Sequence, residues 1–116
     1  MDNTTFTAYV RKQTGTSIID LVGEIDAFAD NGFQDAYNEA ASDSPHTIVL
    51  NFTGVSYINS TGIALIVSLL AKARIAKCRL VVYGLSDYYQ ELFDITSLSD
   101  FMTIYPDEVH ALAVVH

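Results

Sequence analysis

One stretch of sequence organises the rest of the chain: Thr47-Ile48-Val49-Leu50-Asn51-Phe52-Thr53-Gly54-Val55-Ser56-Tyr57-Ile58-Asn59-Ser60-Thr61-Gly62. It opens with a short apolar run rich in β-branched residues, which is typical of a strand buried on both faces. A glycine interrupts the run, and after a brief alternation the period changes at Ile63 to that of a helix. The hydroxyl groups of Ser60 and Thr61 are therefore predicted to lie where a central strand passes into a long helix. In α/β domains, recognition and chemistry collect at such strand ends.

The length and composition predict a single domain that spans residues 1–116. A chain of 116 residues, 50% of them hydrophobic, buries a sizeable core without disulfide or metal staples. The longest apolar run, residues 62–71, is too short to cross a membrane, and the polar N-terminus does not resemble a signal peptide. Cys78 is the only cysteine, so we expect a reducing, cytoplasmic setting and a buried or half-buried thiol at a helix end.

The charge distribution excludes one class of partner. A formal net charge of −8 argues against direct nucleic-acid binding, which requires clustered Lys and Arg. Four of the six basic residues lie within residues 72–79, at the C-terminal end of the predicted central helix. Cations there complement the helix dipole, which explains the cluster without a binding role.

Alternating strand and helix patterns predict the element order ββαβαβαβα. Two close strands joined by a short turn around Gly15 indicate an antiparallel hairpin. The later strands alternate with helices, which favours right-handed crossovers and helices packed on the sheet. The predicted fold class is therefore α/β, a mixed sheet with an N-terminal hairpin. The predicted strands are residues 6–11, 17–25, 47–52, 79–84 and 101–105. The first predicted helix runs from a cap at Asp26 or Asp30 to about residue 41, and the second from residue 60 to about 77. The third runs from a cap at Ser86 to about residue 95, and the last from residue 107 to about 115.

No constellation of catalytic or metal-ligating residues emerges from the sequence. His46, His110 and His116 lack metal-ligand spacing with a cysteine or with one another. The sequence contains no phosphate-binding glycine loop and no nucleophile elbow. We therefore predict no metal, no cofactor and no enzymatic activity.

Two polar or aromatic features allow a structural as well as a functional explanation. Taken alone, Asn59-Ser60-Thr61-Gly62 indicates a turn and a helix N-cap, which is worth about 1 kcal/mol. Tyr88 and Tyr89, near the start of the third helix, form either an interaction patch or a pair in which one ring packs in the core and the other is exposed; we favour the second.

Two motifs resemble those of the STAS domain, and especially those of the stand-alone anti-sigma factor antagonists of bacteria. Residues 47–63 are similar to an apolar strand, Asp-Leu-Ser-Gly-Val, and an Asp-Ser-Ser/Thr-Gly segment that opens a helix. Gly23-Glu24-Ile25-Asp26 resembles the Gly-Glu-Leu-Asp that precedes the first helix in that family. The element order and length also fit, so the resemblance covers nearly the whole chain.

The resemblance implies a partner switch that regulates sigma-factor-dependent transcription. The unphosphorylated antagonist binds an anti-sigma factor that is also a serine kinase, which frees the sigma factor. That kinase phosphorylates the motif serine, here Ser60 with Thr61 as the alternative acceptor, and a PP2C-type phosphatase resets the switch. The partner-binding residues that the resemblance implies are Asp26, Asn59, Ser60, Thr61 and Gly62. The alternative is a STAS scaffold or an accessory subunit of a stress-signalling or transport complex.

Two positions depart from the family pattern. Asn51 stands where the family often has Asp, and Asn59 stands where an acid directly precedes the phosphorylated serine. Asn keeps the size and hydrogen-bonding capacity of Asp but removes the charge. The resemblance also implies that Asp26 lies on a neighbouring loop, where it adds negative charge near Ser60.

Overall fold

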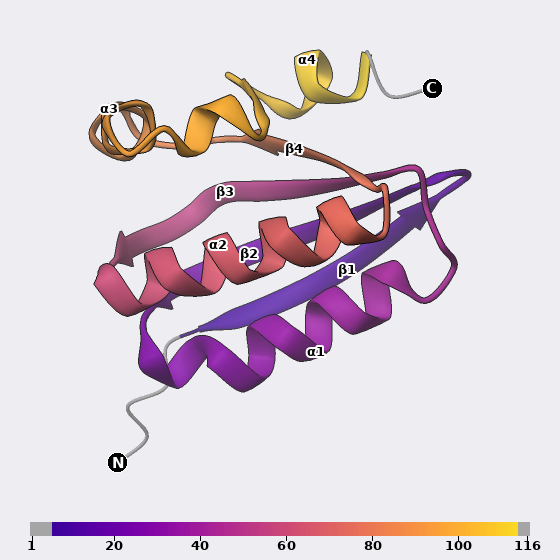
Figure 1. The fold of residues 1–116 in the computed structure, drawn as a ribbon, viewed down its shortest axis with the longest axis horizontal. Helices are drawn as coiled ribbons and strands as arrows, with labels where there is room; N and C mark the ends of the chain where they lie inside the picture. The colour runs from indigo at the N-terminus through magenta and orange to yellow at the C-terminus, as the bar shows by residue number, and fades with distance from the viewer. Residues whose placement is uncertain (1–5, 114–116) are drawn as a thin grey trace.

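The computed structural model describes residues 6–113 and has the predicted α/β architecture (Figure 1). One mixed sheet holds its strands in the order β1-β2-β3-β4-β5. β1 pairs antiparallel with β2, which confirms the N-terminal hairpin, and the later pairs are parallel. The strands are β1 (Thr7–Gln13), β2 (Thr16–Ile25), β3 (Thr47–Ile58), β4 (Arg79–Tyr83) and β5 (Thr103–Tyr105).

The helices cover the two faces of the sheet unequally. α1 and α2 lie side by side over one face (Figure 1), and α3 reaches the same core through Phe93, whose ring meets Phe52 edge-on at 6.3 Å. α4 packs against the opposite face, where Ala111 joins a second small core. The helices are α1 (Asp30–Ala41), α2 (Ser60–Ile75), α3 (Asp87–Ile95) and α4 (Glu108–Ala113), with short 3-10 helices η1 (Ala27–Ala29) and η2 (Leu98–Asp100). Within residues 6–113, no helix is long and apolar enough to span a bilayer.

The start of β3 is buried on both faces, as its apolar run predicts. Ile48 and Leu50 belong to the core under α1 and α2, whereas Val49 belongs to the core under α4. All three side chains are fully buried. This strand is therefore the centre on which both layers pack.

The predicted end of this strand at Phe52 is wrong, because β3 continues to Ile58. Its register with β2 shifts twice, between Asp20 and Val22 and again between Gly23 and Glu24. Such bulges take up extra residues and bend the strand without ending it. The interruption at Gly54 is therefore absorbed within the strand, and the Asn59-Ser60 segment follows its end directly.

Other predicted boundaries move by a few residues. α2 ends at Ile75, two residues before the predicted Lys77, which instead has a left-handed φ of 58°. β1 covers Thr7–Gln13 rather than 6–11, and β5 is limited to Thr103–Tyr105 because η2 and a bend precede it. The predicted last residues of the final helix, 114 and 115, lie outside the described residues.

Candidate functional site

The parallel ends of β2 and β3 bring the two sequence motifs together. Ile25 pairs with Ile58, and the Asn59 backbone N–H donates to the Ile25 carbonyl at 3.2 Å. Asp26 and Asn59, the residues after this last pair, therefore occupy adjoining strand ends. The Asp26 carboxylate caps η1 by accepting from the Phe28 N–H at 2.9 Å. It caps this short turn rather than α1, whose first residue is Asp30.

Asn59, and not Ser60, is the N-cap of α2. The Asn59 side-chain oxygen accepts from the Gly62 N–H at 2.8 Å, and its backbone is extended. Ser60 is the first residue of the helix, and both it and Thr61 are exposed. Among residues 6–113, no group forms a hydrogen bond with the Ser60 hydroxyl. The hydroxyl is therefore free of the capping role that the sequence alone allowed.

Gly62 lets the start of α2 press against the end of β2. A Cβ at this position would lie 2.0 Å from the Ile25 carbonyl oxygen, which is far inside van der Waals contact. Gly62 is buried, so the close approach that its missing side chain permits is to a backbone of the same chain. This contact sets the height of the Ser60 turn above the sheet.

α3 holds the end of β3 from the other side. β4 pairs with β3 only as far as Asn51, so the last residues of β3 have no strand neighbour on that edge. The Tyr89 hydroxyl takes the place of that neighbour: it accepts from the Ile58 N–H at 2.8 Å and lies 3.5 Å from the Ile58 carbonyl oxygen. Tyr89 thereby anchors the residue just before the Asn59 cap.

A hollow of about 390 Å³ lies beside Ser60, between the end of β3, the start of α2 and α3. Ser60, Ile63 and Leu92 line it together with the tyrosines at 57, 88 and 89. Tyr88 is 69% exposed, and its ring meets that of the half-buried Tyr89 edge-on, with 5.0 Å between the ring centroids. This confirms the interpretation in which one tyrosine packs and the other is exposed. The free hydroxyl thus lies on the wall of an aromatic hollow.

The comparisons with known proteins identify the family. The model of the STAS domain matches residues 7–111. This chain belongs to the STAS domain family. It is 35% identical to an anti-sigma-B factor antagonist of Listeria monocytogenes over 95 residues, which cover 80% of this chain and 83% of that protein.

Solved structures with the same fold include an anti-sigma factor antagonist from Mycobacterium paratuberculosis and the phosphorylated form of the Bacillus cell fate determinant SpoIIAA. The Mycobacterium structure has a TM-score of 0.82 and 22% sequence identity, and the match covers 96% of this chain and 94% of that chain. The SpoIIAA structure has a TM-score of 0.74 and 21% sequence identity, and the match covers 95% of this chain and 100% of that chain.

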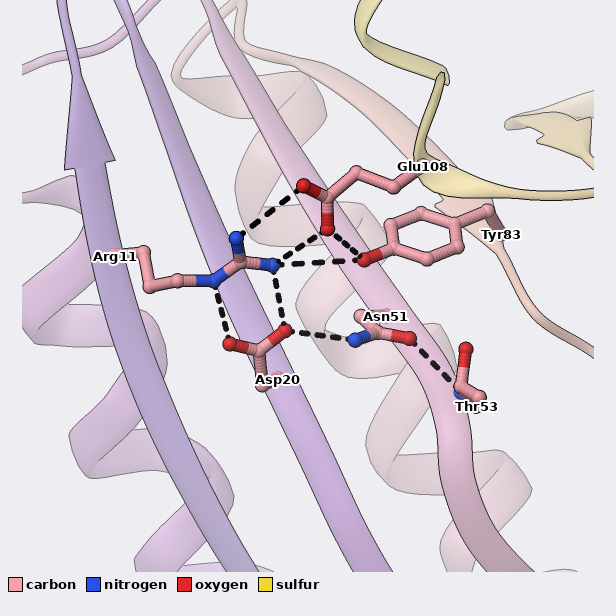
Figure 2. Close-up of polar contacts among 6 residues, drawn as sticks. All are labelled: Arg11, Asp20, Asn51, Thr53, Tyr83 and Glu108. Carbon is pink, nitrogen blue, oxygen red and sulfur yellow. Dashed lines mark hydrogen bonds and ion pairs between the residues drawn. The ribbon is translucent and has the colours of Figure 1, made fainter. Parts of the chain in front are cut away.

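The two departures from the STAS pattern have different structural settings. Asn59 supplies the capping oxygen that an Asp would supply, without its charge. Asn51 lies away from Ser60, on the sheet face that α4 covers: its side-chain N–H donates to Asp20 at 2.7 Å and its oxygen accepts from the Thr53 N–H at 2.9 Å (Figure 2). An Asp at position 51 would place a second carboxylate against Asp20. Asn51 therefore suits the packing of this sheet face.

Arg11 is the centre of the polar cluster in Figure 2, which ties α4 to the STAS sheet. Its guanidinium forms ion pairs with Asp20 at 2.6 Å and with Glu108 at 2.8 Å. The hydrogen bonds to these two carboxylates raise the pKa of Arg11 above its usual value, and the bond to Glu108 has the larger effect. The Tyr83 hydroxyl also donates to Glu108, and burial together with this carboxylate raises the pKa of Tyr83. The cluster thus joins β1, β2, β4 and α4.

The carboxylates of this cluster titrate below their usual range. Hydrogen bonds from Arg11 and Tyr83 lower the pKa of Glu108. For Asp20, burial acts to raise the pKa, but hydrogen bonds from Arg11 and Asn51 together lower it. Both acids therefore stay ionised near neutral pH.

The sequence indicated Asp26, Asn59, Ser60, Thr61 and Gly62, and the structure gathers all five at the ends of β2 and β3. The sequence did not indicate the hydrogen bond between Tyr89 and Ile58 or the Arg11 cluster. Neither has a local signal, since Tyr89 lies 31 residues from Ile58 and Arg11 lies 97 residues from Glu108. Among the described residues, no group of three or more His, Cys, Asp or Glu side chains is arranged to hold a metal ion.

Proposed function

We propose that this STAS domain is an anti-sigma factor antagonist whose binding to its anti-sigma factor is switched off by phosphorylation of Ser60. The observation that carries the proposal is the state of the Ser60 side chain. It is exposed in the first turn of α2, and its hydroxyl is not needed for the cap because Asn59 provides that bond. The name of the Listeria relative supports the antagonist function, and the phosphorylated SpoIIAA structure supports regulation by phosphorylation.

The antagonist's own fold tolerates a phosphate at this position. A phosphate on Ser60 adds about −1.5 to −2 charge at neutral pH. The first turn of α2 contains no acidic residue, and the free N–H groups and the helix dipole there favour an anion. Phosphorylation is therefore expected to leave the fold of the antagonist nearly unchanged.

The cost of the phosphate falls on the complex. An anti-sigma factor that packs on the aromatic hollow beside Ser60 would bury the new charge or face it with its own side chains. The contact surface is proposed to include Asp26, Asn59, Ser60 and Thr61, with Gly62 shaping the turn from below. Asp26 already places one carboxylate at the adjoining strand end, so a second charge at Ser60 makes the surface strongly anionic.

In this mechanism the STAS domain is a substrate and a switch. The anti-sigma factor, acting as a serine kinase with ATP, transfers the phosphate to the Ser60 oxygen. A PP2C-type phosphatase removes it and restores binding. Thr61, the second exposed hydroxyl of the turn, is the alternative acceptor.

A kinase assay with the cognate anti-sigma factor and ATP tests the proposal. We expect one phosphate on the wild type, none on Ser60→Ala and one on Thr61→Ala, as measured by intact-mass spectrometry. Ser60→Asp should weaken binding of the anti-sigma factor and leave the melting temperature nearly unchanged. No phosphate on the wild type, or equal labelling of both alanine variants, would overturn the assignment of Ser60 and favour the scaffold function.

A further inference from the structure

A groove lies at the end of α2 that is remote from Ser60. It runs between the C-terminal half of α2, the start of β4 and residues 98–103, and consists of two adjoining hollows of about 410 and 210 Å³. The hollows share Leu70, Arg74 and Phe101. Arg74 lies fourteen residues after Ser60, so the groove is about 20 Å from Ser60 along the helix. It is therefore separate from the aromatic hollow.

The floor of the groove is apolar and its rim is cationic. Leu70, Ala73, Leu80 and Met102 are buried side chains in the lining of the larger hollow. Arg74 and Arg79 line the same hollow, and Asp100 is the one carboxylate residue in that lining. Burial raises the pKa of the Cys78 thiol, so this lining group stays neutral and does not repel an anion.

The free positive charge of the described chain gathers at this end of the molecule. Arg11 and Lys12 are ion-paired with acids, and Lys72 binds Gln34 and lies over the Tyr37 ring. The three remaining cations, Arg74, Lys77 and Arg79, form no ion pair within residues 6–113. In a chain with a net charge of −8, three cations within residues 74–79 that lack an ion pair among the described residues form a local positive site.

The rim also exposes apolar side chains that a ligand would cover. Phe101 is 50% exposed, and the Arg74 guanidinium lies over its ring at 5.1 Å from the centroid. Val67 lines the smaller hollow and is also exposed. A pocket of a few hundred Å³ with an apolar floor and a few convergent polar groups matches the general character of small-molecule sites. A polyanion is a poorer fit, because the rest of the surface is acidic and would repel it.

We propose that this groove binds an amphipathic small anion, with its apolar body on Leu70, Leu80 and Met102 and its anionic head group between Arg74 and Arg79. The site goes beyond the proposed Ser60 switch and does not depend on it. α2 connects the two, since its first turn carries Ser60 and its last turns line the groove.

Titration of the full chain with sodium octanoate, followed by ¹⁵N–¹H NMR, tests the proposal without a kinase. We expect shifts of the backbone amides of Leu70, Arg74, Leu80 and Met102. The cationic analogue octyltrimethylammonium has the same apolar chain and should bind at least about tenfold more weakly, because it cannot pair with the arginines.

Variants separate the charge of the groove from its shape. Arg74→Gln with Arg79→Gln should weaken octanoate binding at least about tenfold, whereas the pair Arg74→Lys with Arg79→Lys should retain most of it. Lys72→Gln is the matched control, since this residue lies on the same helix but outside the groove lining. Absence of octanoate binding, equal binding of both head groups, or no effect of the double glutamine variant would overturn the proposal.

Discussion

At the scale of single residues, the first turn of α2 divides two roles between neighbours. Asn59 accepts the hydrogen bond that starts the helix, and Ser60 is left as an exposed hydroxyl. The absence of a charge at position 59 therefore does not remove the cap. Compared with an Asp, the uncharged Asn59 side chain lowers the electrostatic repulsion that a phosphate on Ser60 would meet.

Asn59→Ala is expected to destabilise the domain by about 1 kcal/mol, because the Gly62 N–H loses its acceptor at the helix start. Asn59→Asp should retain the cap and stay close to the wild type. The free energy of unfolding in urea measures both. Ser60→Ala is the control on the next residue and should be nearly neutral, and a loss as large as that of Asn59→Ala would contradict the division of roles.

At the scale of elements, two contacts fix where this turn lies. Gly62 sets α2 against the end of β2, and Tyr89 ties α3 to the end of β3. The Tyr89 contact replaces what a longer β4 would otherwise supply, since β4 pairs with β3 only up to Asn51. The site is therefore built from β2, α2 and α3 around the end of β3, which extends beyond its pairing with β4.

Gly62→Ala should destabilise the domain by about 2 kcal/mol or more, although Ala favours helices over Gly by about 1 kcal/mol. The new Cβ would meet the Ile25 carbonyl oxygen at 2.0 Å, so the helix start has to move. Gly32→Ala in α1 is the matched control, because its Cβ would meet only the Phe6 ring at 3.3 Å. Urea unfolding compares the two, and an equal effect of both substitutions would rule out the proposed close contact.

Tyr89→Phe should cost about 0.5–1.5 kcal/mol, because the Ile58 N–H then lacks its hydrogen-bond acceptor. Amide hydrogen exchange at Ile58 should become faster, and phosphorylation of Ser60 should become less efficient. Tyr88→Phe is the matched control: this ring is exposed, and its hydroxyl has no hydrogen-bond partner within residues 6–113. Indistinguishable exchange rates at Ile58 in the two variants would refute an anchoring role for Tyr89.

At the scale of the whole molecule, the Arg11 cluster links the first strand to the last helix. Its members come from residues 11 to 108, and they hold α4 on the sheet face that α1 and α2 leave open (Figure 2). Ion pairs of partly exposed groups contribute little each, typically up to about 1 kcal/mol. Their effect on stability should therefore be seen mainly in its pH dependence.

Stability should fall when the pH drops below about 4, where unfolded Asp and Glu residues take up protons. The folded pKa values of Asp20 and Glu108 are lowered, so their contribution is complete above the unfolded pKa and is lost as the pH falls through the folded value. Glu108→Gln should make the acid limb of the stability curve shallower, as measured by urea unfolding between pH 7 and 3. Glu91→Gln is the control, since Glu91 is exposed and forms no ion pair among the described residues. Identical acid limbs in the wild type and Glu108→Gln would exclude Glu108 as a source of this pH dependence.

Much of the fold could be predicted from local patterns. The apolar run at residues 47–50 indicated the central strand, and the turn at Gly15 indicated the hairpin. The end of β3 was misplaced because a glycine between two bulges of a continuing strand has the same local sequence signal as a glycine that ends a strand. The cap was assigned only to a four-residue segment, since Asn and Ser are both good caps and only the geometry separates them.

The element order, the α/β class and the position of Ser60 at a strand-to-helix junction follow from the sequence alone, because periodicity and turn chemistry are local properties of the chain. The folded chain establishes that Asn59 caps the helix, that Tyr89 and Gly62 hold the Ser60 turn in place, and that Arg74 and Arg79, which form no ion pair within residues 6–113, line a groove at the far end of α2. Tyr89 and Gly62 contact residues that are distant in the chain, and strand register and crossover packing, which no single segment encodes, bring them together. The Asn59 cap is a local contact, but the backbone geometry of the helix start selects it from two good capping residues.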